Sequence, residues 1–482
     1  MSWQGAWQQT FDFYGHKPIV IEPVDTHLST DAGLLPIRQF DESIGLTEQF
    51  AGALLDRRCG PALKHTYLEM TRSRVYGILA GYEDQNDHGA LRSDAIFKLV
   101  AGRSPKDDDL ASQPTLSRFE NAITPKSFFR LQEILFDQFV ASFDEPPTCL
   151  TFDIDTFDDP THGDQQLTFF HGFYGQYQYQ PRAITCAEND QVVMVALLFG
   201  TASPALAIGD DLKCLATRLR EVWPGLRILI RADSGFATPS FYNACERLQL
   251  EYTVGLKMNA VLQRNSEHLV EEAVRRFEET GQPQRLFTAY WYRAGSWPAP
   301  RWVVQKVEAN AQGTNRRAVL TNRAGALVLP EAAYDAYADR GESENRNKEL
   351  KCSLAADRLS DHRFMANYFR LYLHCLAGNL LVRVRGLVAD PPPSEESNEL
   401  PTEALAGRKR KRWFNRRREH DPLGEGHAET WRMRLIKVAA EINVSTRRIL
   451  VRLSGSWPFL NHYLAVSQAV NEASGRLDLD SS

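Results

Sequence analysis

Apolar residues recur at helical spacing through most of the first 145 residues. The pattern predicts helices at 46–58, 62–83, 112–123 and 125–143. Polar, turn-rich stretches separate them, and Arg118 is expected to be exposed on the third. Short helices joined by tight turns are typical of a helix-turn-helix that reads DNA, and equally of a packing domain. Residues 1–145 are therefore predicted to form a helical N-terminal domain, with Arg118 as a candidate DNA contact.

From residue 149 the pattern changes to short runs rich in β-branched and aromatic residues. These runs predict strands at 149–155, 168–175, 182–188, 192–200, 227–233 and 251–257. Helices are predicted at 205–224 and 240–250. Strands that come first and then alternate with helices indicate an α/β fold, with a mixed sheet flanked by helices.

Residues 258–330 interrupt this alternation. A predicted helix at 266–281 is followed by RLFTAYWYRAG, RWVVQKVEAN and RRAVLTNRA, which are typical of antiparallel strands. We interpret 258–330 as a β-rich insertion within a catalytic domain of residues 146–257 and 331–390. Its aromatic residues form a small core or stack on nucleobases, and Trp297 is a candidate for the second role.

The C-terminal part, 391–482, begins with a Pro/Ser/Glu-rich linker that follows a long apolar helix at 366–387. The whole chain has a net charge of only −5, but residues 401–460 hold 14 Lys and Arg against 6 Asp and Glu. Such a basic segment indicates a polyanionic partner. Helices are predicted after it, the first at 430–442. Within this helical basic region we expect DNA contacts from Arg410, Arg412 and Arg417.

The composition excludes several other classes of protein. The 482 residues contain no run of eighteen apolar residues, so no membrane span and no membrane partner are expected. No basic stretch precedes an apolar core near residue 1, so no signal peptide is expected. Seven cysteines without a CxxC pair indicate reduced thiols and a cytoplasmic protein, and argue against zinc ribbons.

Residues 334–351, YDAYADRGESENRNKELK, form an unusual predicted helix. At about 100° per residue, Tyr337, Arg340, Glu344 and Lys351 share an arc of roughly 60°. Glu342 and Glu349 point well away from this arc. Arg340 and Glu344 are four residues apart, so a simple surface ion pair is the alternative interpretation.

Two upstream aspartates follow strands of the predicted sheet. Asp155 ends the first strand, and Asp233 ends the apolar strand at 227–233. Carboxyl ends of strands are where active sites of α/β sheets form, so both can meet Glu344. Three carboxylates suit Mg²⁺ or Mn²⁺ and in-line phosphoryl transfer. Turn caps, or the carboxylate pair of a glycosidase, are the alternatives.

These residues resemble the active site of a DDE transposase with a ribonuclease-H-like core. The spacing Tyr337-x2-Arg340-x3-Glu344-x6-Lys351 matches the Y-R-E-K signature of the IS4-related transposases. Other stretches resemble the IS1380 family of insertion-sequence transposases: GYEDQNDHGALRSD, QPTLSRFEN, DIDTFDDPTHGDQQ, RADSGFA and ANYFRLYLH. The resemblance thus covers most of the chain, and it also implies a mostly β insertion before Glu344.

The resemblance implies that Asp155, Asp233 and Glu344 are catalytic and bind two Mg²⁺ or Mn²⁺ ions. Arg340 and Lys351 would hold DNA phosphates, and Tyr337 would pack against the DNA backbone or a displaced base. The first aspartate stays open, because Asp153 lies on the same face of its strand as Asp155. Asp155 is preferred, since it lies at the strand end and Thr156 follows it, as in related motifs.

The function implied is cut-and-paste transposition of a bacterial insertion sequence. The partner is double-stranded DNA, both the element ends and the target, bound by a homodimer in the cytoplasm on the nucleoid. Two alternatives remain: a catalytically silent DNA-binding protein derived from a transposase, and a structure-specific nuclease of the same fold.

Overall fold

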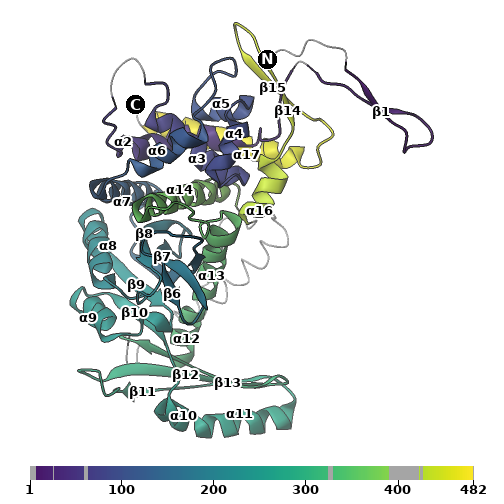
Figure 1. The fold of residues 1–482 in the computed structure, drawn as a ribbon. Coiled ribbons are helices and arrows are strands. Elements are labelled where there is room, and N and C mark those ends of the chain that lie inside the picture. The colour runs from purple at the N-terminus through teal and green to yellow at the C-terminus, as the bar shows by residue number, and fades with distance from the viewer. Residues whose placement is uncertain are drawn as a thin grey trace.

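The computed structural model describes residues 7–24, 26–58, 63–323, 329–389, 423 and 427–480. Their largest feature is a ten-stranded mixed sheet. Helices flank the sheet, and a helical body covers one end of it (Figure 1). The prediction of an α/β protein with a mixed sheet is therefore confirmed.

Five strands form the centre of the sheet in the order β8-β7-β4-β9-β10. They are β4 (Cys149–Thr156), β7 (Gln176–Cys186), β8 (Val192–Phe199), β9 (Arg227–Ala232) and β10 (Glu251–Leu256). β4, β9 and β10 are parallel, and β7 is antiparallel to β4 and β8. Ile154 pairs with Ala232, so the carboxyl ends of β4 and β9 lie side by side. Asp155 and Asp233 each come one residue later.

Helices pack on both faces of the sheet. One face packs against α7 (Pro125–Val140), α8 (Ile208–Val222) and α9 (Pro239–Arg247). The other face packs, at β7 and β8, against α14 (Phe364–Val388). Among the described residues, α14 is the one helix long and apolar enough to cross a membrane, but it is mostly buried inside the protein.

The first part of the chain is mostly helical, as predicted. It holds α1 (Leu34–Ile44), α2 (Leu46–Gly52), α3 (Tyr67–Ala80), η1 (Gln85–Asp87), α4 (His88–Leu91), α5 (Ala95–Ala101) and α6 (Gln113–Asn121). Three short strands precede these helices: β1 (Gln9–Phe11), β2 (Ile19–Ile21) and β3 (His27–Ser29). β1 and β2 form a hairpin that extends away from the body (Figure 1).

The prediction of a helix over 430–442 is wrong for its second half. Helical turns α16 (Ala428–Trp431) and η4 (Arg432–Ile436) end before Lys437, and a strand, β14 (Ala440–Val444), follows. β14 lies between β3 and β15 (Ile449–Leu453). Ala440 and Ile442 are buried on one face of β14, so tertiary pairing overrides the local helical pattern. The last helix is α17 (Leu460–Asp480).

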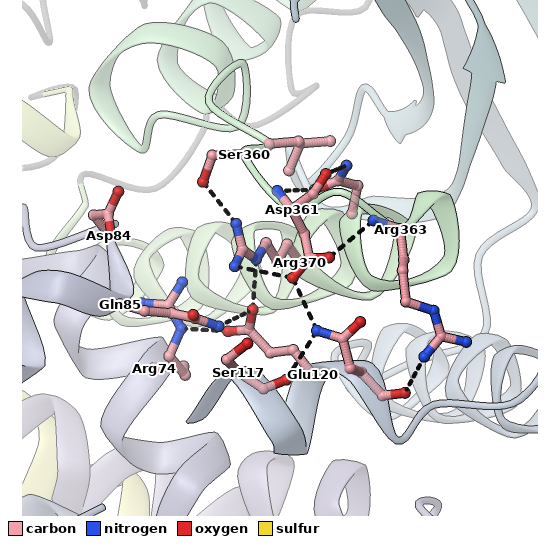
Figure 2. Close-up of polar contacts among 12 residues, drawn as sticks. Arg74, Asp84, Gln85, Ser117, Glu120, Ser360, Asp361, Arg363 and Arg370 are labelled. Carbon is pink, nitrogen blue, oxygen red and sulfur yellow. Dashed lines mark hydrogen bonds and ion pairs between the residues drawn. The ribbon is translucent and has the colours of Figure 1, made fainter. Parts of the chain in front are cut away.

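Polar residues join the N-terminal helices to α14 (Figure 2). Glu120 on α6 is fully buried and pairs with Arg74 at 2.7 Å and with Arg370 at 2.5 Å. Arg370 also donates to Ser360 at 2.8 Å, in the segment between the helix of Glu344 and α14. One carboxylate therefore connects α3, α6 and α14, at a point that also fixes this segment.

The insertion extends the main sheet instead of forming a separate one. It contains α10 (Ala260–Asn265), α11 (Glu267–Thr280), β11 (Gln284–Tyr292), β12 (Arg301–Asn310) and β13 (Gly313–Thr321). The three predicted antiparallel strands are confirmed, and β13 pairs with β10.

Short elements complete the part of the fold that surrounds Asp155 and Asp233. They are β5 (Asp159–Pro160), β6 (Phe169–His171), η2 (Ser234–Phe236), α12 (Pro330–Ala338), α13 (Arg340–Lys348) and the π-helical turn η3 (Glu349–Ser353). α12 contacts β10 and β12, and α13 contacts β4. The predicted helix over 334–351 is thus present as three consecutive helical pieces.

Candidate active site

Asp153 and Asp155 lie on the same face of β4 but have different partners. Asp153 is only 2% exposed, and its two carboxylate oxygens accept bonds from Arg231 on β9 at 2.6 and 2.7 Å. Arg231 also donates to the carbonyl of Ala336 on α12 at 2.8 Å. Asp153 therefore serves to neutralise a buried arginine, which leaves Asp155 as the carboxylate available to a site.

Arg340 connects Asp155 to the helix of Glu344. Its guanidinium donates from Nη1 to Asp155 Oδ2 at 3.2 Å and from Nη2 to Glu344 Oε1 at 2.5 Å. The same guanidinium lies 5.8 Å from the centre of the Tyr337 ring. The i,i+4 ion pair considered from sequence is therefore present, but the same arginine also holds the strand-end aspartate.

Asp233 lies at the end of β9 and caps the short turn η2. Its Oδ1 accepts a hydrogen bond from the Gly235 backbone N–H at 2.8 Å. Tyr337 lies close by, because a Cβ built on Gly255 of β10 would come 2.6 Å from the tyrosine hydroxyl and 3.1 Å from Ser234 N. Glycine at 255 therefore allows β10 to pass directly beneath Tyr337 and next to Asp233.

The charged side chains near Arg340 also affect the pKa values of Asp155 and Tyr337. Burial raises the pKa of Asp155 to about 6; Arg340 opposes this rise, while Asp233 and Glu344 add to it. Burial likewise raises the pKa of Tyr337, which Arg340 opposes and Asp233 reinforces. Asp233 and Glu344 are thus both near enough to act on Asp155, and Arg340 is the cation that opposes them.

Lys351 pairs with an aspartate that lies between β4 and β5. Its ammonium group lies 2.5 Å from Asp158 Oδ1, and Gln176 Nε2 donates to Asp158 Oδ2 at 3.2 Å. Burial raises the pKa of Asp158, but the contact with Lys351 outweighs it and leaves that pKa below its ordinary value. This pair was not predicted from the sequence. The only available signal was the acidic run DIDTFDD itself.

Glu349 is turned away from the site, as its helical angle predicted. It is buried between Arg346 at 3.1 Å and Arg385 at 2.9 Å, and it accepts the Ala428 N–H at 2.6 Å. The side chain of Glu342 lies outside the described part of the structure.

Comparison with known families identifies the chain. It matches the family model of the transposase DDE domain, group 1, over residues 11–398. The chain belongs to this family of DDE transposases. Among solved structures it is similar to piggyBac transposase in a synaptic complex with hairpin DNA, at 14% identity and a TM-score of 0.38, over 82% of this chain and 83% of that one. No curated protein matches the chain.

DDE transposases are enzymes that cut and join DNA, and the family generally uses divalent metal ions. The donors of this chain fit such ions chemically, because Asp155, Asp233 and Glu344 supply hard carboxylate oxygens. Among the described residues, however, no group of three or more acidic, His or Cys side chains is arranged as ligands of a metal ion. Asp155 and Glu344 both form ion pairs with Arg340, and the Glu344 side chain is 57% exposed.

Of the remaining predicted DNA contacts, Arg118 is a described residue. Arg118 is exposed on α6, where it donates to Thr115 at 3.1 Å. Arg410, Arg412 and Arg417 fall outside the described residues.

Trp297 must be corrected as a stacking candidate. It is 5% exposed and packs edge-on against Tyr242 and Tyr292, with the guanidinium of Arg301 over its ring. The alternative interpretation, that the aromatics form a small core, applies to this residue. The exposed tryptophan of the insertion is Trp291, on β11.

Proposed function

We propose that this DDE transposase belongs to a bacterial insertion sequence of the IS1380 family and has a ribonuclease-H-like catalytic core. The strand order β8-β7-β4-β9-β10 supports this core, because β7 runs in the direction opposite to the other four strands. The stretch QPTLSRFEN, which forms α6, is among those that support the family. The protein acts in the cytoplasm on nucleoid DNA. It binds the terminal inverted repeats as a dimer, because two element ends must be held together.

One observation carries the proposal most strongly. Arg340 contacts Asp155 and Glu344 at the carboxyl edge of two adjacent parallel strands, and the charge of Asp233 adds to the raised pKa of Asp155. A cluster of like charges around one buried cation is costly to maintain in a fold. The cluster lies at the carboxyl ends of the strands, which is where active sites of α/β sheets form.

Divalent cations bound by Asp155, Asp233 and Glu344 would supply Lewis-acid stabilisation of the attacking and leaving oxygens. Arg340, freed from the carboxylates, and Lys351 would hold DNA phosphates through charge-assisted hydrogen bonds. Tyr337 would pack against the DNA backbone or a displaced base. Water hydrolyses one phosphodiester at each element end and leaves a 3′-OH. That 3′-OH then attacks a target phosphodiester, so no serine or tyrosine nucleophile is required.

Replacement of Asp233 by asparagine tests this function. The Asp233→Asn protein is expected to bind a duplex containing the DNA that flanks the gene, and to lose Mg²⁺-dependent cleavage by about 100-fold or more. Exposed Asp210 on α8 offers the matched control, and Asp210→Asn should cleave like the wild type. Wild-type cleavage by the Asp233→Asn protein would exclude the proposed catalytic site.

A further inference from the structure

The hairpin that joins β6 to β7 exposes an unusual number of aromatic rings. Phe173 at its turn is 85% exposed. Four further exposed aromatic residues lie on the same hairpin: Phe169, Phe170, Tyr174 and Tyr177. We call residues 169–177 the aromatic hairpin. Large exposed apolar groups gathered in one place mark an interaction site, because folding alone does not favour them.

The rings support one another instead of filling a core. Phe170 and Tyr177 are paired across the hairpin with ring centres 5.6 Å apart. Phe173 and Tyr174 lie 5.1 Å apart, and Phe169 packs on Phe199 of β8 at 5.8 Å. A hairpin stiffened in this way presents its rings in a fixed arrangement, which lowers the entropy lost when a ligand binds.

The aromatic hairpin is attached to the candidate active site. Gln176 donates to Asp158, and Asp158 holds Lys351. The Tyr174 hydroxyl is close enough for Asp158, Lys351 and Asp155 to act on its pKa, which burial raises. A DNA strand that reaches Lys351 with a phosphate therefore passes this hairpin.

We propose that the aromatic hairpin binds unpaired nucleotides of the DNA strand next to the phosphodiester that is cut. This inference rests on the proposed function, because it takes its ligand from the reaction at Asp155 and Asp233. Bases within a duplex are stacked on each other and show only their edges, whereas unpaired bases offer a π-face to Phe and Tyr. Lys351 supplies the positive charge for the DNA backbone. Grooves that bind single-stranded DNA likewise combine aromatic rings with a positive charge.

A binding assay without divalent metal separates this role from cleavage. The probes are a fluorescein-labelled 12-nucleotide oligo(dT) and a blunt 12-base-pair duplex, titrated with the full chain. The Phe173→Ala/Tyr177→Ala protein is expected to bind oligo(dT) at least about 5-fold more weakly, with less than about 2-fold change for the duplex. Phe173→Trp should retain binding of oligo(dT), because it keeps a stacking surface.

Phe129, which is exposed on α7, supplies the matched control, and Phe129→Ala should bind both probes like the wild type. Circular dichroism checks that each variant is folded. Unchanged oligo(dT) binding by the double variant would overturn the inference. So would equal loss with both probes, or a change of oligomeric state by light scattering, which would assign the hairpin to a second copy of the chain. None of these outcomes affects the Asp233→Asn test, so the two proposals fail separately.

Discussion

Two aspartates on β4 illustrate how neighbouring residues of one type acquire opposite roles. Asp153 forms two short hydrogen bonds with a buried arginine of the next strand, so its charge is needed by the fold. Asp155 is largely buried among other carboxylates, and its charge is costly, as its raised pKa of about 6 indicates. A residue whose charge the fold does not favour, at a strand end, is a candidate for function.

This contrast predicts different consequences for the two substitutions. Asp153→Asn should lower the free energy of unfolding by about 3–5 kcal/mol, because it leaves Arg231 buried without a carboxylate. Asp155→Asn should leave stability unchanged or slightly higher, and should abolish Mg²⁺-dependent cleavage. Urea unfolding at neutral pH, together with a cleavage assay, measures both effects. A stable, inactive Asp153→Asn protein would instead make Asp153 the catalytic residue.

At the scale of elements, the sequence predicts individual strands and helices better than their contacts. The strands at 149–155 and 227–233 and the helix at 125–143 are apparent because their apolar periodicity is strong. The strand β14 was missed because its two partners are β15 and β3, and β3 lies more than 400 residues earlier in the chain. Trp297 was misassigned for a similar reason, since its burial depends on Tyr242 from another element.

For the helix that carries Glu344, too, the sequence predicted local geometry better than contacts with other elements. Its angular arrangement predicted correctly that Glu349 faces away, because that follows from local geometry. It did not predict that Arg340 holds Asp155, or that Lys351 pairs with Asp158, since both partners come from β4 and the loop after it. Lys351 itself lies in the π-helical turn η3, and such turns are frequent at functional sites.

The prediction at the scale of elements concerns Gly255, where β10 passes beneath Tyr337 of α12. Gly255→Ala places a methyl group within 2.6 Å of the Tyr337 hydroxyl and 3.1 Å of Ser234 N. Either Tyr337 or the end of β9 must move, so cleavage should fall by about 10-fold or more, and stability by about 1–3 kcal/mol. Gly386 on α14, where an added Cβ meets open space, is the control, and Gly386→Ala should retain activity. Full activity of Gly255→Ala would show that the position of Tyr337 is not critical.

At the scale of the whole molecule, the two ends of the chain and the catalytic sheet share α14. Residues of α1, α3, α17 and β8 belong to one hydrophobic core around it. Buried polar groups also link the helices of this core, as Glu120 links Arg74 and Arg370 (Figure 2). The parts predicted from sequence as a helical N-terminal domain and a C-terminal region therefore stabilise each other, and one titration inside this core affects the entire fold.

His374, on α14, is such a group. It is buried, its Nδ1 lies 2.8 Å from the Leu354 carbonyl, and burial lowers its pKa from 6.5 to about 3, with Arg74 and Arg370 adding to the effect. Between pH 6.5 and 3 the unfolded chain therefore binds a proton that the folded chain excludes. The stability that depends on neutral His374 is fully present above pH 6.5, and is lost by about 1.4 kcal/mol per unit as the pH falls below it.

Urea unfolding at several values of pH measures this dependence. His374→Gln, whose amide can still donate to Leu354, should be less stable than the wild type at pH 7, but should lose less stability on going to pH 5. His268, exposed on α11, is the control, and His268→Gln should follow the wild-type slope because its imidazole meets water in both states. Equal slopes for His374→Gln and the wild type would mean that His374 does not titrate on unfolding. The acid sensitivity would then come from other buried groups around α14, such as His88, whose pKa burial also lowers.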